Sequence, residues 1–371
     1  MKPKHLIGFI IAICFFEIAT SQEENIEFSL GGQAIGWTNL NFSDPIRNQW
    51  GVRYLPEMSG EYLLGDQWKI NAEALVNAYG SYTFQEDNYT QHADLKPYRL
   101  WLRLSSNQFE LRAGLQKINF GTASMIRPLM WFDKVDPRDP LQLTDGVYGL
   151  LARYYFLNNA NIWGWILYGN ELTKGWEIFP GNKKTPELGG RVQFPLLNGE
   201  IGMSFHHRRI PEDSLKIMDT FHQYQEMTQD KIGLDGKWDV GMGVWFEYVL
   251  KKQSKSYIFS KKYDQFLNLG TDYTFGIGSG ITAGFEHFMM SSCDKIFYDP
   301  ERLNFSALSL TYPIGLTDMI TGMIYYNWKD QSWYRFINFN RSYDRISLYL
   351  MAYWNPENFN IYRNVGEQNL F

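Results

Sequence analysis

The sequence predicts an all-β chain that forms a transmembrane antiparallel up-and-down β-barrel of about 16–18 strands. Three observations support this fold. From Ile26 onward, apolar residues recur at every second position in runs of roughly 8 to 12 residues. Short turns alternate with long polar stretches along the chain. In many of the runs, the positions between the apolar residues, the opposite parity, carry charged side chains. Helical spacing never holds for long.

Composition excludes several other classes of protein. Aromatic residues make up 17% of the 371 residues, yet outside one N-terminal apolar run the chain has no apolar segment long enough for a membrane-spanning helix, which needs about 20 residues. The net charge of −5 gives no support for a nucleic-acid partner. Two cysteines cannot form a disulfide framework, and no Cys/His spacing fits zinc, so we expect no metal site and no cofactor.

The first residues have the pattern of a secretory signal peptide. Lys2 and Lys4 give a basic start, an apolar stretch follows over Leu6–Phe16, and small residues lead to an expected cleavage after Ser21. The apolar run is too short to span a membrane as a helix, which argues against an anchor. We therefore expect a signal peptide at 1–21 and an exported chain of residues 22–371 that forms one barrel domain.

The predicted strands follow in order. A first strand lies near 26–38. In Trp68–Phe84 one parity is apolar, including Val76, and the other includes Lys69 and Glu73. We expect the apolar parity to face lipid, and Val76→Arg near the bilayer midplane to cost about 2–4 kcal/mol. The same alternation is found in the later runs 98–105, 109–116, 232–238, 240–248, 267–275, 281–288 and 346–354.

The connections alternate between short and long. Short turns are expected at 65–66, 105–107, 158–159, 198–199, 239, 276–280, 313–318 and 342–344. Longer polar stretches are expected at 85–96, 121–146, 169–186, 210–229, 251–266 and 289–302. Short turns on one side and long loops on the other are typical of outer-membrane barrels. The eight hairpins, the strand near 26–38 and a last strand near 359–371 would give an even-numbered barrel of eighteen strands, with sixteen as the alternative.

The alternative fold is a soluble exported sandwich, because a core-facing stripe is as apolar as a lipid-facing one. Three features favour the barrel: strand lengths near those that span a membrane, the persistent difference between the two sets of connections, and charges on the other parity. Tyr and Trp near strand ends also fit the aromatic belts at membrane interfaces.

These features together with the terminal Phe371 resemble the Gram-negative outer-membrane porin family, whose last strand ends in an aromatic residue. A second likeness covers 110–156, where an Arg-x-Gly-x-Gln strand, Arg112-Ala113-Gly114-Leu115-Gln116, leads to Gly121 and then to an Arg-Pro and Asp-rich loop. The resemblance implies outer-membrane localisation and a loop that folds into the lumen. Arg363, Glu367 and Asn369 depart from the apolar pattern of that family's last strand.

The loop at 121–146 is the most informative segment. It contains Met125, Leu129 and Trp131 as well as charged residues, and loops with so much apolar content pack against something. Folded into the lumen, its charges would face wall residues and form a hydrophilic constriction with a transverse field. Ion pairing that merely holds the loop is an equally weighted alternative. Besides Glu73, the expected constriction residues are Arg99, Arg103, Glu110, Arg112, Arg127, Asp133, Asp136, Arg138, Asp139 and Arg153.

An enzyme is the weaker interpretation. Adjacent strand residues point to opposite faces, so His206 and His207 cannot share one site. His207 falls on the apolar parity, as the histidine of a barrel hydrolase could, but spacing places no Ser or acidic partner beside it. We therefore expect no catalytic residues.

The sequence thus predicts a porin-like channel for passive or weakly selective diffusion of small polar solutes. Outer-membrane lipid and lipopolysaccharide are the expected surroundings, and a homo-oligomer is compatible with the pattern. The alternative is a non-conducting barrel that serves as an anchor or as a partner in a surface complex, because large residues such as Trp101 and Tyr349 could close the lumen. The sequence specifies neither the substrate nor the oligomeric state.

Overall fold

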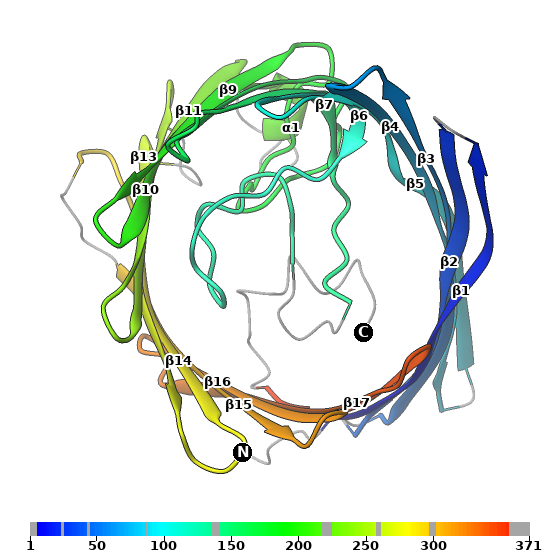
Figure 1. Cartoon of the computed structure of the whole chain (residues 1–371). Coiled ribbons are helices and arrows are strands. Elements are labelled where there is room, and N and C mark those ends of the chain that lie inside the picture. The colour runs from blue at the N-terminus through cyan, green and yellow to red at the C-terminus, as the bar shows by residue number, and fades with distance from the viewer. Residues whose placement is uncertain are drawn as a thin grey trace.

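The computed structural model describes residues 6–23, 26–42, 45–86, 88–135, 141–216, 225–256, 261–296 and 302–355, and for residues 6–23 it describes the backbone alone. Within these residues the chain is almost entirely β-strand (Figure 1). The strands are β1 Leu6–Glu23, β2 Ile26–Asn41, β3 Arg47–Leu64, β4 Trp68–Gln85, β5 Asn88–Ser105, β6 Phe109–Gln116, β7 Val147–Tyr155, β8 Asn161–Leu167, β9 Glu187–Leu196, β10 Gly199–Ile210, β11 Met227–Asp239, β12 Gly243–Gln253, β13 Tyr263–Phe275, β14 Ile281–Cys293, β15 Arg302–Ile314, β16 Asp318–Asn327, β17 Ser332–Ser342 and β18 Ile346–Trp354. A short helix, α1 Glu212–Lys216, lies between β10 and β11.

The strands form an antiparallel up-and-down sheet, as predicted. Each strand from β2 to β17 pairs with the next one along the chain, and β1 pairs antiparallel with both β2 and β18. The ring is therefore complete only through β1, which lies almost wholly within the predicted signal peptide. The cleavage of that segment stays a prediction.

Because β1 is antiparallel to both of its neighbours, β2 and β18 run in the same direction. Without β1, seventeen strands would remain with two parallel edges, and a strand antiparallel to both would be needed to join them. The predicted last strand near 359–371 would satisfy this requirement, but it lies outside the described residues and stays a prediction.

The two faces of the strands follow the predicted alternation. On β4 the outward residues Trp68 and Val76 are 37% exposed, whereas inward Asn71 and Asn77 are buried. Val76 thus lies on the predicted lipid face. It is the fifth outward position from the short-turn end of β4. At the rise of a tilted strand, the midplane of the bilayer falls at Ala72 and Ala74, so Val76 lies closer to the outer interface than to the midplane.

The connections differ from the predicted set at one place. Residues 85–96, expected as a long polar loop, belong instead to the hairpin of β4 and β5, whose strands extend to Gln85 and restart at Asn88. Polar residues such as Asn88, Thr90 and His92 fill the inward parity there, which hid the alternation. The stretch 169–186 is a loop as expected, and 210–229 holds a loop with α1.

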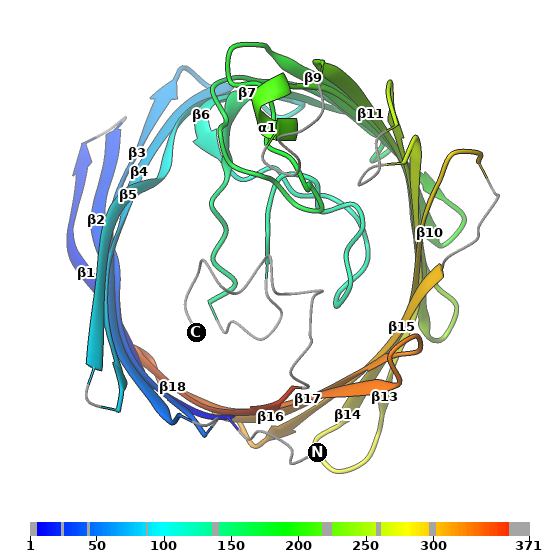
Figure 2. The ribbon, with the colours of Figure 1, turned by 180° about the vertical axis from the view of Figure 1, so that it is seen from behind.

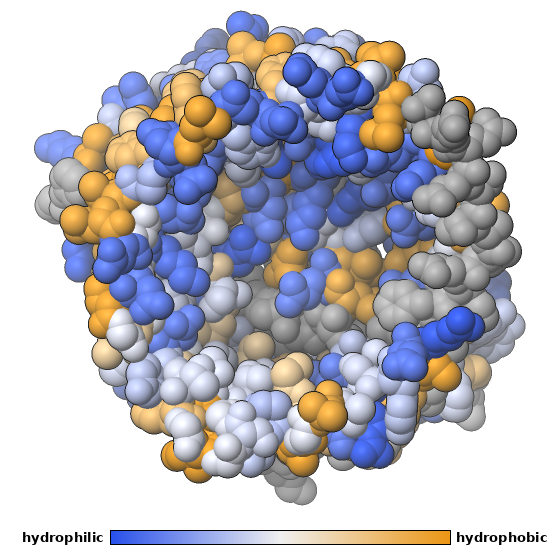
Figure 3. Space-filling model, viewed as in Figure 1, coloured by the Kyte–Doolittle hydropathy of each residue, from blue (hydrophilic) through white to orange (hydrophobic). Residues whose placement is uncertain are grey.

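Long connections bend into the lumen instead of outward into solvent. Figures 1 and 2 show the described parts of the segments after β6 and β8, and α1 after β10, inside the ring on the side of β6 to β11. Hydrophilic side chains line much of the opening that remains (Figure 3). No helix in the described part of the chain is long and apolar enough to cross a membrane.

The outward face predicts a depth-dependent cost for charge. We expect Ala72→Arg, at mid-height on β4, to lower the free energy of unfolding in lipid by about 2–4 kcal/mol. Val76→Arg, which lies nearer the interface, should lower it by about 1 kcal/mol or less. Unfolding by guanidinium in phospholipid vesicles measures both. Equal costs at the two positions would contradict the assigned depth.

Candidate functional site

The described parts of the loop, residues 121–135 and 141–146, lie inside the lumen, and two wall glutamates hold the first part there. Glu247 on β12 accepts backbone N–H groups of Thr122, Ala123 and Leu129 at 2.6, 2.8 and 2.9 Å. One wall carboxyl thus binds three backbone N–H groups of the loop at once. The loop thereby finds partners for backbone groups that would otherwise be buried without any.

Glu286 on β14 holds the next part of the same loop. It accepts backbone N–H groups of Ser124, Met125 and Ile126 at 2.7, 3.1 and 2.7 Å. Asn268 on β13 donates both to Glu286, at 3.0 Å, and to the carbonyl oxygen of Ile126. Successive N–H groups that converge on an anion form a concave nest, and here the anions are wall side chains.

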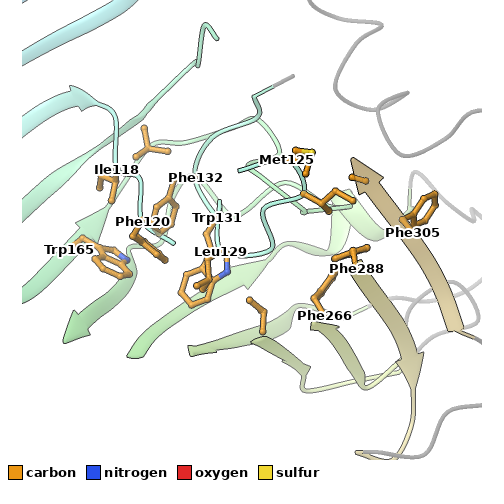
Figure 4. Close-up of a cluster of buried hydrophobic side chains, with 14 of the residues drawn as sticks. Ile118, Phe120, Met125, Leu129, Trp131, Phe132, Trp165, Phe266, Phe288 and Phe305 are labelled. Carbon is orange, nitrogen blue, oxygen red and sulfur yellow. The ribbon is translucent and has the colours of Figure 1, made fainter. Parts of the chain in front are cut away.

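The apolar residues of the loop pack between the loop and the wall. Leu129 and Trp131 are buried in a cluster that reaches Phe266 and Phe288 on the wall (Figure 4). Phe120 stacks on Trp165 of β8 with the two ring centroids 5.6 Å apart. The apolar content that distinguished this segment in the sequence is thus a core inside the barrel, and it fixes the loop on the side of β6 to β14.

A second loop, 168–186, supports the first from the same side. Glu177 contacts Arg208 of β10 at 2.9 Å and Lys231 of β11 at 2.8 Å, and Lys174 contacts Glu187 of β9 at 2.8 Å. All five side chains are buried. Burial alone would raise the pKa of the Glu177 carboxyl, but the cations of Arg208, Lys174 and Lys231 outweigh it and hold that pKa below its usual range.

The two loops also touch one another. The Trp176 indole donates to the carbonyl oxygen of Arg127 at 2.8 Å, and Lys134 donates to the hydroxyl of Thr173 at 2.7 Å. The ion network and these contacts were not predicted from the sequence. Lys174 and Glu177 lie in a polar loop with no local signal, and their wall partners come from three different strands.

The predicted basic residues of the wall form a continuous group. Arg103 and Arg112 are direct cross-strand neighbours on β5 and β6, and Glu110 is opposite Arg153 of β7. Glu110 contacts Arg112 at 3.0 Å and Arg153 at 3.9 Å. We name Arg103, Arg112 and Arg153 the basic ladder. The structure therefore brings these three and Glu110 together on the wall.

Arg99 is separated from the ladder by its role in holding the loop. It is buried, and its guanidinium donates to the carbonyl oxygen and the hydroxyl of Thr144 at 3.0 and 2.7 Å. The guanidinium also lies 4.1 Å from the centre of the Tyr98 ring. The contacts of Arg99 thus match the alternative in which a charged residue holds the loop: Arg99 binds the end of the loop to β5.

The charges on the described part of the loop do not face the basic ladder. Arg127 donates to Asn119 at 2.8 Å, within the loop region. Asp133 is buried, and neither of its carboxylate oxygens accepts a hydrogen bond from the described residues. Burial raises the pKa of the Asp133 carboxyl to about 6. Asp136, Arg138 and Asp139 lie outside the described residues.

Among the described residues, the acidic side chains beside the basic ladder belong to the wall. Four glutamates on β2 to β4 face the lumen beside the ladder, and we name them the acidic strip: Glu27, Glu57, Glu61 and Glu73. Together with Trp101 and Arg103 they line a recess of about 600 Å³. Glu61 accepts from Lys69 and Asn71, both at 2.7 Å, and Glu73 accepts from the Trp101 indole at 3.2 Å.

Within this recess, Trp101 lies where the two signs of charge meet. The guanidinium groups of Arg103 and Arg112 lie 5.6 and 4.7 Å from its ring centre. Glu27 is directly opposite Glu61 on the neighbouring strand, so two like charges face each other. Of the acidic strip only Glu73 was expected from the sequence. Inward parity alone could have indicated Glu57 and Glu61, since both alternate with outward Met58 and Tyr62.

The wall on the other side of the lumen has no charge. The inward positions of β15 to β18 are apolar, aromatic, hydroxyl or amide residues throughout, among them Phe305, Ser309, Met323, Tyr325, Asn338, Asn340, Tyr349 and Tyr353. Part of this wall packs with β2 and β3: Trp37, Leu55 and Phe336 belong to one buried cluster, and Leu141 and Leu143 of the inward loop contact it.

The histidines on the outer face form separate pairs. His207 contacts Asp230 at 2.6 Å, a partner that sequence spacing did not place, and His287 contacts the hydroxyl of Ser306 at 2.9 Å. His206 faces inward, where it contacts Glu187 and the Trp165 indole, both at 3.1 Å. No hydrogen bonds among the described residues join a serine, a histidine and an acid in one chain, and these residues contain no group suited to hold a metal ion.

Comparisons with known proteins show the fold. No protein-family model matches the chain, and no curated protein matches it. Among solved structures, the chain resembles OmpF of Salmonella typhi, solved with daunomycin, with a TM-score of 0.53 and 8% identity over 91% of this chain and 99% of that one. It also resembles OccK7 of Pseudomonas aeruginosa, with a TM-score of 0.51 and 10% identity over 95% and 97% of the two chains. Both likenesses support a porin-type β-barrel.

The glutamate clamp can be tested without reference to transport. We expect Glu247→Gln with Glu286→Gln to loosen the loop, because each amide keeps one acceptor oxygen but turns an N–H group toward other donors. Each substitution should lower the free energy that holds the loop against the wall by about 1.5–3 kcal/mol. Limited proteolysis of the folded barrel measures it as faster cleavage at 122–135. Glu200→Gln is the matched control, since Glu200 bonds only to Gln193 near the short turns. Unchanged cleavage in the double variant would contradict the clamp.

Asp133 predicts a pH dependence of loop stability. Its pKa is about 6 in the folded chain and about 3.9 when unfolded. Between these values the folded state binds more protons, so its stability falls as pH rises from about 4 to 6 and stays low above. We expect Asp133→Asn to stabilise the protein at pH 8 by up to about 3 kcal/mol, and by much less at pH 4. Guanidinium unfolding at both pH values measures this difference, and an effect independent of pH would contradict it.

Proposed function

We propose that the chain forms a porin-like channel in the cell outer membrane, through which small polar solutes diffuse passively or with weak selectivity. The observation that carries this proposal is the inward loop, clamped by Glu247 and Glu286 against one side of a porin-type barrel. It narrows the lumen and leaves a charged passage along β2 to β7. The likeness to OmpF and OccK7 supports the class of protein but not a substrate.

The charged passage has the arrangement that selects solutes by charge. The acidic strip and the basic ladder lie side by side on the wall, with Trp101 between them. Charges of opposite sign side by side on one wall of a narrow, low-dielectric passage produce a field along that wall. The expected constriction is therefore kept in modified form: its two poles are Glu27, Glu57, Glu61 and Glu73 on one hand and Arg103, Arg112 and Arg153 on the other.

The outer face fits lipid and lipopolysaccharide. Apolar residues cover it at mid-height, and cations such as Arg209, Lys252 and Arg335 lie on the outward face toward the long-loop end of β10 to β17. Cations at that height are suited to anionic headgroups. The proposed localisation is the outer membrane, reached through the predicted signal peptide.

One observation favours the alternative function, a non-conducting barrel that acts as an anchor or as a partner in a surface complex. The buried cluster of Trp37, Leu55 and Phe336, with Leu141 and Leu143 of the loop against it, fills part of the lumen beside the acidic strip. Tyr349 packs on the same cluster, as the sequence suggested, whereas Trp101 lines the recess.

Ion selectivity separates the two functions. We expect the purified barrel in planar bilayers to conduct, and Arg103→Gln with Arg112→Gln to shift the permeability ratio toward cations several-fold, because the acidic strip would then dominate the field. Deletion of residues 122–140 should raise the conductance. Arg341→Gln is the control, since Arg341 pairs with Asp318 on the outward face. A folded barrel without any conductance would support the anchor instead.

A further inference from the structure

The hairpin of β4 and β5 continues beyond the end of β6 and leaves a sheet edge open. β5 pairs with β4 from Asn88 to Ser105, but it pairs with β6 only from Leu100 onward. Among the described residues, the edge of β5 from Asn88 to Arg99 therefore has no neighbouring strand. Every residue of 88–95 is exposed on both faces of the strand, so no other part of the described chain packs over this edge.

The upper part of this edge lies outside the membrane. Gly80 of β4 is directly opposite Ala93 of β5, so the two residues have the same height. Gly80 is twelve residue steps from Trp68 at the short-turn end, which corresponds to a height of about 30 Å at the usual rise and tilt. The apolar band of an outer-membrane barrel is only about 25 Å tall. Residues 88–93 therefore stand above the bilayer on the side of the long loops.

Alternate residues of the edge direct their backbone N–H and C=O groups away from β4. β4 ends at Gln85 and β5 starts at Asn88, so these two residues flank a two-residue turn and form a hydrogen-bonded pair. In an antiparallel ladder such pairs alternate with pairs that are not hydrogen-bonded. Tyr89, Gln91 and Ala93 belong to the second kind, so their N–H and C=O groups point to the open side.

The edge is guarded against other chains only in its lower part. Open edges normally have charged residues or proline, which discourage the pairing of a further strand. Asp94, Lys96 and Pro97 have this role here, and Pro97 falls on the parity whose N–H group would point to the open side. Residues 88–93 contain neither a formal charge nor a proline. This unguarded segment is therefore suited to accept a strand.

We propose that residues 88–93 bind an extended segment of a second, different polypeptide at the cell surface, which adds to the sheet as a strand beside β5. In strand addition, main-chain hydrogen bonds supply the affinity, here from Tyr89, Gln91 and Ala93, and the side chains of alternate residues supply the specificity. The binding does not depend on whether the barrel conducts.

The two faces of β5 determine the chemistry of the added segment. On the outward face Tyr89 lies beside Phe84 of β4, and both are exposed, so the added strand needs apolar side chains on that face. On the inward face Thr90 and His92 favour polar neighbours. The segment that fits therefore has about six residues, alternates between apolar and polar side chains, and lacks proline.

A second copy of this chain does not supply that strand. Barrel strands are tilted by about 35–45° from the membrane normal, and copies in one membrane share their orientation. A half-turn about the normal therefore makes the two β5 strands cross at roughly 70–90°. Neighbouring strands of a sheet differ in direction by only about 20–25°. The partner is thus a separate chain whose segment is free to align with the edge.

Amide hydrogen exchange, resolved for single residues by fragmentation in a mass spectrometer, tests the proposal. In the purified barrel we expect the N–H groups of Tyr89, Gln91 and Ala93 to exchange within seconds. In outer-membrane vesicles from the cells that produce the chain, a bound strand should slow that exchange by roughly tenfold or more. Slow exchange in the purified barrel would show that the chain covers its own edge, and equal rates in both samples would show that nothing binds. Either result overturns the proposal.

A proline at the edge distinguishes a bound strand from crowding. Gln91→Pro removes one free N–H group without breaking a bond to β4, so Tyr89 and Ala93 in the vesicles should return to the rates of the purified barrel. Gln91→Ala is the matched control, because it keeps the N–H group and should keep the protection. A heat-dependent gel shift checks that both variants form a barrel. Protection that survives Gln91→Pro would come from the surrounding lipopolysaccharide, and the proposal would be wrong.

Photo-cross-linking in the same cells identifies what is bound. p-Benzoylphenylalanine in place of Tyr89 keeps an aromatic ring at the edge. We expect an adduct with a different polypeptide, through a peptide with the alternation described above, which is lost with Gln91→Pro and kept with Gln91→Ala. An adduct of two copies of this chain, or an adduct with lipopolysaccharide alone, contradicts the proposal.

Discussion

The structure depends on one constraint, that backbone N–H and C=O groups inside a bilayer must be paired within the protein. A sheet meets it only when the two edges join, and here β2 and β18 run in the same direction, so they require one strand between them. In the structure β1 occupies that place. If the predicted signal peptide is cleaved, the gap between β2 and β18 needs another strand antiparallel to both, and the predicted strand near 359–371 is the candidate for it. Strand number, strand direction and processing are therefore linked.

Inside the ring the same constraint reappears in another form. A loop that folds into a lumen needs partners for its own backbone, and it cannot obtain them from a neighbouring strand, because the strands are already paired. The wall supplies side-chain carboxyl groups instead: Glu286 accepts from three successive N–H groups, and Glu247 accepts from those of Thr122, Ala123 and Leu129. The second loop is instead held to the wall by side-chain ion pairs, from Lys174 to Glu187 and from Glu177 to Arg208 and Lys231. Polar wall residues thus have two roles: some line the proposed passage, and those that contact the loops hold the loops in place.

Much of the fold could be predicted because a strand in a barrel has one simple rule, a period of two. The outward placement of Val76 and the neighbouring positions of Arg103, Arg112 and Arg153 follow from it directly. The rule failed at 85–96, where polar inward residues beyond the membrane removed the contrast between the two parities. It also cannot place a loop against a distant wall. That Asp133 is buried away from the basic ladder, and that Glu57 and Glu61 face it instead, depends on contacts between residues more than 40 positions apart.

The two walls of the lumen have a consequence for the orientation of whatever passes between them. One wall, along β2 to β7, has both signs of charge, and the other, along β15 to β18, offers only hydroxyl, amide and aromatic groups. In the proposed channel the passage is off-centre, because the inward loops fill the side of β6 to β14. A solute with a charged end and a neutral body would therefore travel with its charged end turned to one wall, so that the barrel acts on the direction in which a molecule faces as well as on its size.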